Sequence, residues 1–252
     1  MKTPAEHALA KVPEVTWGFW LIKIAATTLG ETGGDAVSMS MHLGYLISTG
    51  IFAVVFLAAV ITQIKAERFH PFLYWTTIIA TTTVGTTLAD FADRSLGIGY
   101  AGGSSLLLFL LLGTLFVWHR TLGSVSVSSV SSPKAEAFYW LTIMFSQTLG
   151  TALGDWTADT AGLGYTGAAV VFGGLLALVL MAYCWTRVSR TLLFWAAFIL
   201  TRPLGAVIGD FLDKPHSAGG LALSRYGASA ALLAFMLTAI LLFKQRAAKT
   251  AH

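Results

Sequence analysis

Residues 19–35 read FWLIKIAATTLGETGGD, and three related stretches follow along the chain. They are YWTTIIATTTVGTTLAD at 74–90, YWLTIMFSQTLGTALGD at 139–155 and FWAAFILTRPLGAVIGD at 194–210. In each stretch an aromatic residue and a Trp are followed by Gly ten residues and Asp fifteen residues after the Trp. A carboxylate inside a membrane-spanning segment costs on the order of 3 kcal/mol. Four of them at one repeat position therefore indicate a site built by repetition, the Asp ring of Asp35, Asp90, Asp155 and Asp210.

The composition predicts an integral membrane protein. Hydrophobic residues make up 56% of the chain and charged residues 11%, and the mean hydropathy is +0.72. Eight apolar stretches approach the roughly 20 residues needed to cross a bilayer. They cover residues 17–37, 43–63, 71–91, 98–118, 137–157, 163–184, 191–211 and 222–243. We therefore expect an all-α fold of eight transmembrane helices.

Basic residues predict the orientation. With eight spans both termini lie on one side, and cytoplasmic loops of membrane proteins are enriched in Lys and Arg. If residue 1 is inside, eleven basic residues lie inside against three outside, Arg94, Lys214 and Arg225. The inside set is Lys2, Lys11, Lys65, Arg68, Arg120, Lys134, Arg187, Arg190, Lys244, Arg246 and Lys249. Both termini are thus expected in the cytoplasm. The basic balance reflects topology, and no nucleic-acid partner is expected.

The repeats predict the domain organisation. The spacings between the four Trp residues are 55, 65 and 55, and the extra ten residues fall in the Ser-rich stretch 124–132. We expect a first half at 1–120, a cytoplasmic linker at 121–135 and a second half at 136–252. Each repeat holds two spans, which predicts four parallel helical hairpins around a pseudo-fourfold or pseudo-twofold axis along the membrane normal. The odd spans are rich in Thr, Ser and Gly and are expected at the centre, with Leu-rich even spans facing lipid.

Steps of four residues along each odd span stay on nearly one helix face. They define four layers, 3, 7, 11 and 15 residues after each Trp. From the first repeat to the fourth, the sets are Lys23, Thr27, Glu31, Asp35; Ile78, Thr82, Thr86, Asp90; Ile143, Gln147, Thr151, Asp155; and Phe198, Arg202, Ala206, Asp210. Asp93, Asp159 and Asp213 lie one turn further out and form an acidic mouth.

These layers offer oxygen ligands. Carboxylates with Thr and Gln suit hard or borderline cations, and manganese is favoured among divalent ions. The candidate ion site is the Asp ring, which is also the candidate metal site, with Glu31, Thr86, Thr151 and Gln147. Lys23 and Arg202 are expected to pair with Glu31 and the Asp ring, and Asp93, Asp159 and Asp213 to act in pairing or gating. No cofactor is expected beyond a bound divalent cation.

Two further interpretations concern single elements. Asp at the end of each odd span also suits a structural cap that bonds amides of the following turn. Arg202-Pro203 places a helix breaker in the fourth repeat, which predicts a kink or an interruption of the seventh span.

On these Trp, Gly and Asp positions the chain resembles a bacterial family of integral membrane proteins built of four tandem two-helix repeats, a repeat domain of unknown function with one Trp per repeat. The resemblance covers nearly the whole chain and implies the repeat architecture and a place in the bacterial inner membrane. It implies no activity. The fourth repeat departs from the pattern, because Lys214-Pro215-His216 interrupts it.

The leading functional hypothesis is a secondary transporter of a hard or borderline cation, coupled to protons through Glu31. Its partners are the lipid bilayer, a small cation or solute, and protons. The alternatives are a transporter of a small organic solute held by Lys23 or Arg202, a cation channel, an intramembrane aspartyl hydrolase, and a scaffold in which the Asp residues are caps. An enzyme is not expected, since a hydrolase needs only two of the four carboxylates.

Overall fold

Eight α-helices make up most of the described chain. The structure is a computed structural model that describes residues 11–248, so Lys2 and Lys249 of the orientation argument lie outside it. The helices are α1 (Trp17–Asp35), α2 (Gly44–Lys65), α3 (Pro71–Asp90), α4 (Tyr100–Leu122), α5 (Pro133–Asp155), α6 (Gly164–Trp185), α7 (Arg190–Asp213) and α8 (Arg225–Leu242). Five of them, α2, α4, α6, α7 and α8, are long and apolar enough to cross a membrane. The predicted all-α class is confirmed.

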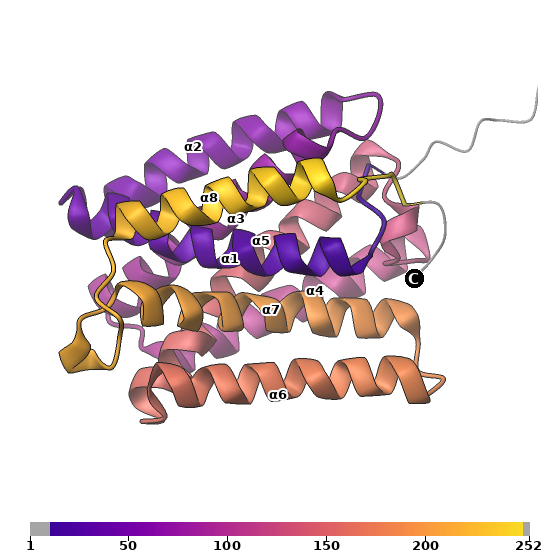
Figure 1. The fold of residues 1–252 in the computed structure, drawn as a ribbon. Helices are drawn as coiled ribbons and strands as arrows, with labels where there is room; N and C mark the ends of the chain where they lie inside the picture. Colours follow the sequence, from indigo (N-terminus) through magenta and orange to yellow (C-terminus); the bar gives the residue numbers. More distant parts are fainter. Residues whose placement is uncertain (1–10, 249–252) are drawn as a thin grey trace, which may run out of the picture.

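The odd-numbered helices form the centre of the bundle. α1 packs against α3, α3 against α5, α5 against α7, and α7 returns to α1 (Figure 1). Most of their Thr residues are buried, whereas the even helices expose large apolar side chains such as Leu106, Phe109 and Leu241. This is the arrangement expected from the Thr-rich and Leu-rich spans, because hydroxyl and small residues pack between helices and Leu faces lipid.

The pairing of helices differs from the expected hairpins. Each even helix packs chiefly against the odd helix that follows it, α2 on α3, α4 on α5 and α6 on α7, and α8 packs on α1. The connections explain this arrangement. Only residues 66–70 join α2 to α3 and 186–189 join α6 to α7, and short connections produce antiparallel neighbours. After α1, α3 and α5 the chain instead continues into π-helical turns at Ala36–Ser40, Phe91–Ser95 and Trp156–Thr160.

The aromatic–Trp pairs close the ring of odd helices at one end. The first residue of each pair contacts the Trp of the next repeat, and the fourth repeat contacts the first. Ring centroids lie 5.5 Å apart for Phe19–Trp75, 5.7 Å for Tyr74–Trp140, 6.1 Å for Tyr139–Trp195 and 5.9 Å for Phe194–Trp20. Such pairs contribute about 1 kcal/mol each beyond their buried area. Because all four Trp residues meet at this end, the four odd helices run in the same direction.

The repeated Gly is the point of close approach between neighbouring odd helices. A Cβ atom on each Gly would press on the residue seven positions after the Trp of the next repeat. The pairs are Gly30 with Thr82, Gly85 with Gln147, Gly150 with Arg202 and Gly205 with Thr27. Small residues allow helix backbones to approach in this way. The Gly position therefore sets the register in which the four layers meet.

The predicted interruption of the seventh span is wrong, because α7 runs unbroken from Arg190 to Asp213 with Pro203 inside it. The proline ring lies against α5 at Gly150, where a Cβ atom would be 3.0 Å from Pro203 Cδ. Absence of a side chain on Gly150 leaves room for the ring between the two helices, and α7 continues although Pro203 has no N–H to donate within the helix.

Substituting Gly205 tests the close approach. Gly205→Ala should lower the thermal unfolding midpoint of the purified protein in detergent, because the new methyl overlaps Thr27 and overpacking costs about 1–3 kcal/mol. Gly33→Ala in α1 is the matched control, since apart from its own turn of helix no atom of residues 11–248 lies within 4 Å of its Cβ position, and Ala favours helix. Equal midpoints for the two variants would contradict the assignment.

Candidate functional site

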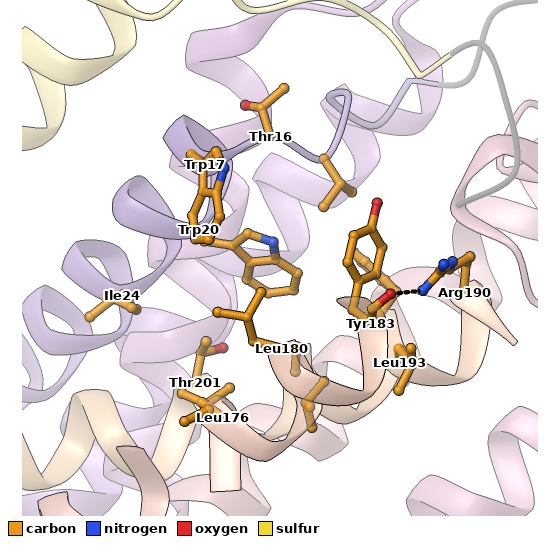
Figure 2. Close-up of a pocket in the computed structure, with 15 residues that line it drawn as sticks. Thr16, Trp17, Trp20, Ile24, Leu176, Leu180, Tyr183, Arg190, Leu193 and Thr201 are labelled. Carbon is orange, nitrogen blue, oxygen red and sulfur yellow. Dashed lines mark hydrogen bonds between the residues drawn. The ribbon is translucent and has the colours of Figure 1, made fainter. Parts of the chain in front are cut away.

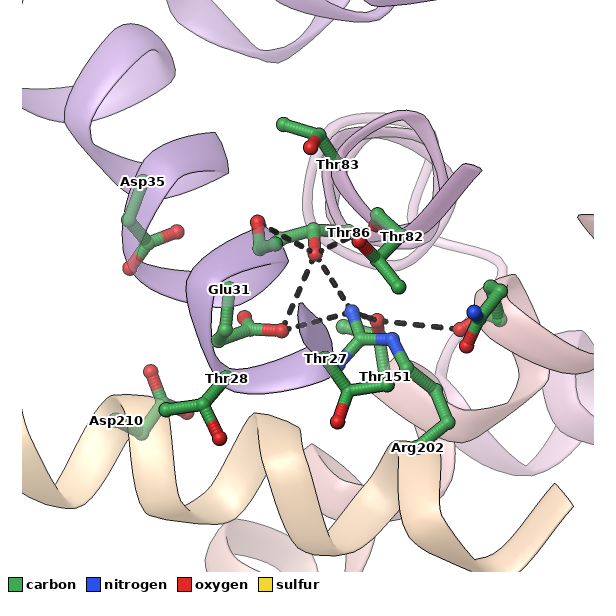
Figure 3. Close-up of polar contacts among 12 residues, drawn as sticks. Thr27, Thr28, Glu31, Asp35, Thr82, Thr83, Thr86, Thr151, Arg202 and Asp210 are labelled. Carbon is green, nitrogen blue, oxygen red and sulfur yellow. Dashed lines mark hydrogen bonds and ion pairs between the residues drawn. The ribbon is translucent and has the colours of Figure 1, made fainter. Parts of the chain in front are cut away.

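Arg202 lies at the centre of the bundle and contacts the other three odd helices. Its Nη2 donates to Glu31 Oε2 at 2.9 Å, to Thr86 Oγ1 at 2.6 Å and to Thr151 Oγ1 (Figure 3). Glu31, Thr86 and Thr151 are the residues eleven positions after the Trp in their repeats. The fourth member of that layer is Ala206, which is small and fully buried. The layer predicted from the sequence is therefore brought together around one guanidinium group.

The Arg202–Glu31 ion pair is almost completely buried, with 0% and 4% of the two side chains exposed. The predicted pairing of Arg202 with Glu31 is confirmed. Thr86 supports it, because its hydroxyl also contacts Glu31 Oε2 at 3.2 Å. Removing one partner of such a pair leaves an uncompensated buried charge, which is strongly unfavourable.

The Asp ring divides into two pairs at the opposite end from the aromatic residues. Asp35 and Asp210 share Lys214, whose Nζ lies 2.6 Å from Asp35 Oδ2 and 2.9 Å from Asp210 Oδ1. Asp90 and Asp155 share Arg94, with Nε 2.9 Å from Asp90 Oδ1 and Nη2 3.1 Å from Asp155 Oδ2. Within residues 11–248, no backbone amide donates to these carboxylates. Their interactions are ion pairs with basic side chains, not the helix caps considered from the sequence.

A third carboxylate joins the first pair. One oxygen each of Asp35, Asp210 and Asp213 lies within 4.8 Å of the others. Asp213 Oδ2 pairs with Arg225 Nε at 2.8 Å, and that Nε also lies 3.8 Å from Asp35 Oδ2. Asp35 Oδ1 and Asp213 Oδ1 are buried and have no hydrogen bond from any residue of 11–248. Two acceptor oxygens therefore remain free in a cluster that already holds one ammonium group.

Lys214 is held as a cation by this cluster. Burial alone would lower its pKa, but the neighbouring carboxylates of Asp210 and Asp35 raise the pKa above the ordinary value for Lys. Its ammonium group lies where carboxylate oxygens of the first and fourth repeats converge. A positive charge at this position is favoured over the whole physiological pH range.

The outer acids of the mouth differ in their surroundings. Asp93 is half-buried, and burial raises its pKa while Arg94 partly opposes the shift. Asp159 is exposed. Only Asp213 of the three joins an Asp of the ring in one cluster of close carboxylates among the described residues.

The basic residues of this end were missed as site residues by the sequence reasoning. Arg94, Lys214 and Arg225 were considered only as the three basic residues expected on the outer side of the membrane. Arg94 follows Asp90 by four residues and Lys214 follows Asp210 by four, a spacing that places opposite charges on one helix face. That signal was present in the sequence. The contact of Arg225 with Asp213 joins the two ends of a long connection and has no such local signature.

Two predicted site residues lie apart from these ion pairs. Lys23 is fully buried, and its ammonium group has no hydrogen-bonding partner in the described chain; it lies 4.2 Å from the centroid of the Phe198 ring. The expected pairing of Lys23 with a carboxylate is therefore wrong. Lys23 is two turns below Glu31 on α1, and Arg202 takes the place beside Glu31. Both amide atoms of Gln147 are also buried without a partner.

The axis is closed at the aromatic end. The Tyr74 and Tyr139 hydroxyl groups are 2.6 Å apart and buried among the Trp residues. Outside the ring, Lys11 pairs with Glu136 at 2.6 Å and donates to carbonyls at the end of α2. In the described part of the chain, packed aromatic side chains thus fill the axis at this end.

A separate hollow lies on the outside of the bundle between α1, α6 and α7 (Figure 2). Its volume is about 400 Å³, and its lining is largely apolar, with Trp17, Trp20, Leu180 and Tyr183 among the lining residues. It contains none of the predicted site residues. We assign the functional site to the charged axis, because buried charges in an apolar chain mark function more specifically than an apolar groove.

The central ion pair can be tested by a double-mutant cycle. Arg202→Met should destabilise the protein by about 3–5 kcal/mol, because Glu31 is left buried and unpaired. Adding Glu31→Gln should restore part of that loss, so the double variant unfolds at a higher temperature than Arg202→Met alone. Arg187→Met, which removes an exposed Arg, is the control. Additive effects of the two substitutions would contradict the coupling.

The comparison with known proteins agrees with the repeat pattern. A family model described as Repeat of Unknown Function (DUF347) matches residues 18–69, 73–124, 138–189 and 193–250. No curated protein and no solved structure matches the chain. Each matched segment begins one residue before an aromatic–Trp pair, and the four cover nearly all of the chain. The chain therefore belongs to the Repeat of Unknown Function (DUF347) family.

Proposed function

We propose that this protein is a secondary transporter of a hard or borderline divalent cation, with Mn²⁺ the favoured ion. The observation that carries the proposal is an excess of buried carboxylates at one end of the bundle. Five carboxylates, those of the Asp ring and Asp213, face three basic side chains, Arg94, Lys214 and Arg225. Two negative charges remain uncompensated, which equals the charge of one divalent cation.

In this proposal all eight helices span the bacterial inner membrane as a multi-pass bundle with cytoplasmic termini. α1, α3 and α5 carry too many polar residues to face lipid, and the even helices shelter them. Because Lys and Arg are enriched in cytoplasmic segments, the aromatic end faces the cytoplasm in this proposal and the Asp ring lies near the outer surface. A cation entering from outside meets the exposed Asp159 before it reaches the buried carboxylates.

Asp35, Asp210 and Asp213 are the proposed ion ligands. Their oxygens lie within 4.8 Å of one another, and the free Oδ1 atoms of Asp35 and Asp213 add two ligands of the type that Mg²⁺, Ca²⁺ and Mn²⁺ prefer. Lys214 acts as a tethered competitor. Its ammonium group occupies the cluster when no ion is bound, and an arriving divalent cation displaces it because two charges attract the carboxylates more strongly than one.

The Glu31–Arg202 pair is the proposed coupling element. Glu31 lies one turn below Asp35 on α1, between the ion cluster and the closed aromatic end. A proton that reaches Glu31 removes the charge that holds Arg202 across the axis, so Arg202 is free to leave Thr86 and Thr151. Because two uncompensated carboxylates accept either one divalent cation or two protons, we propose exchange of the cation for two protons.

Ion binding can be measured by thermal unfolding and isothermal titration of the purified protein in detergent. Mn²⁺ should raise the unfolding midpoint of the wild type, and Asp213→Asn should weaken Mn²⁺ binding by about tenfold or more, equivalent to about 1.4 kcal/mol. Asp159→Asn is the matched control, since it removes an exposed carboxylate at the same end. Absence of stabilisation by Mn²⁺, Mg²⁺ or Ca²⁺ would overturn the cation proposal.

Removing Lys214 gives a prediction of opposite sign. If its ammonium group competes with the ion, Lys214→Met should bind Mn²⁺ more tightly than the wild type. Loss of binding would show that Lys214 organises the carboxylates and does not compete for them.

The coupling of Mn²⁺ transport to protons is tested in proteoliposomes with an internal pH indicator. Mn²⁺ uptake by the wild type should raise the internal pH, because protons leave in exchange, whereas Glu31→Gln should bind Mn²⁺ in detergent but neither carry it inward nor change the internal pH.

A further inference from the structure

A second polar cluster lies on the axis, inward of the Arg202–Glu31 ion pair. It consists of Lys23 from α1, Gln147 from α5, and the Nε and Nη1 atoms of Arg202 from α7. All three side chains are fully buried. Lys23 Nζ, both amide atoms of Gln147 and both of these Arg202 nitrogens have no hydrogen-bonding partner in the described chain. Nearly all buried polar groups in proteins are paired, so five unpaired atoms in adjacent layers require an explanation.

The charges of this cluster are unbalanced in the positive direction. Arg202 has a carboxylate partner in Glu31, but Lys23 has none. A positive charge on Arg202 disfavours a second positive charge on Lys23. The centroid of the Phe198 ring lies 4.2 Å from Lys23 Nζ, and the resulting cation–π interaction is weaker than the hydration that a buried ammonium loses. The ammonium form of Lys23 therefore lacks a counter-charge, and an anion beside it would stabilise that form.

Unpaired hydrogen-bond donors also outnumber unpaired acceptors in this cluster. The unpaired donors are Lys23 Nζ, Gln147 Nε2 and the two Arg202 nitrogens, whereas Gln147 Oε1 is the one unpaired acceptor. A water molecule donates as well as accepts and leaves the charge unchanged. An anion accepts from several donors and neutralises the excess positive charge.

We propose that Lys23, Gln147 and Arg202 bind a small monovalent anion, either a halide or the carboxylate of a small organic acid. The remaining members of the inner layer, Ile78, Ile143 and Phe198, are apolar and buried. Such surroundings favour weakly hydrated anions over sulfate or phosphate, which lose more hydration on entry. Lys23 is twelve residues from Asp35, about 18 Å along α1, so this site is separate from the cation cluster.

The test is the anion dependence of thermal unfolding for the full-length protein in detergent, with chelator present so that no divalent cation contributes. Chloride, bromide, nitrate, formate and sulfate are each compared with gluconate at equal ionic strength. Bromide or formate should raise the unfolding midpoint by about 3–6 °C at saturation, and sulfate should not. A response to halides identifies an inorganic anion, and a response confined to formate identifies a carboxylate ligand.

Variants decide whether the response belongs to this cluster. Lys23→Met should unfold at the same temperature in every anion, and Gln147→Leu should need about tenfold more bromide or formate for the same shift. Lys65→Met, a substitution at the inner end of α2 away from the axis, should respond as the wild type does. If Lys23→Met does not fold, two other results assign the anion response to this cluster. They are the weaker response of Gln147→Leu and an anomalous-scattering peak for bromide beside Lys23.

Two results would overturn the proposal. One is a wild-type midpoint that is equal in all anions, which would indicate water in the cluster. The other is an anion response that Lys23→Met retains. Neither result bears on Mn²⁺ binding at Asp35, Asp210 and Asp213, so failure of the anion site and failure of the proposed function are distinguishable.

Discussion

The close approach of neighbouring odd helices at the repeated Gly is the constraint on which the rest of the structure depends. At each contact a Gly in one repeat accommodates the side chain seven positions after the Trp of the next. This contact sets both the distance between the helices and their register. Because this register is the same around the ring, the residues eleven positions after each Trp lie at one level of the bundle. The residues fifteen positions after it lie at another. The Arg202 contacts and the divided Asp ring follow from this alignment.

The repeat sets the positions of the four odd helices. The few residues that differ between repeats make the site asymmetric. Where three repeats carry Thr or Gln seven positions after the Trp, the fourth carries Arg202, and only the first repeat carries Glu31 in the next layer. Arg202 and Glu31 meet in the buried interior, and the fourth member of the Glu31 layer is the small residue Ala206. A ring with Arg at all four positions would repel itself. The asymmetry is thus a condition for burying charge at the centre.

The sequence predicted the helical class, the central position of the Thr-rich helices, and the layers with the Arg202–Glu31 pair. These features follow from hydropathy and a four-residue period, which are local properties. The packing of α8 on α1 depends on closure of the ring, which no single repeat shows. The roles of Arg94 and Lys214 were within reach through their four-residue spacing from Asp, whereas Arg225 reaches Asp213 across a loop. The pairing of Lys23 was predicted wrongly, because the layers alone do not show whether Lys23 or Arg202 pairs with Glu31.

The order of contacts around the ring has an implication for the origin of the chain. Every repeat presents one surface to the repeat after it and a different surface to the repeat before it, and the fourth closes on the first. Identical subunits in a cyclic tetramer are related in this way. The chain is built as a tetramer of two-helix subunits whose four copies have been joined end to end. In a single chain each repeat can carry a different residue at an equivalent position, so one Arg and one Glu suffice where four identical subunits would each supply the same residue.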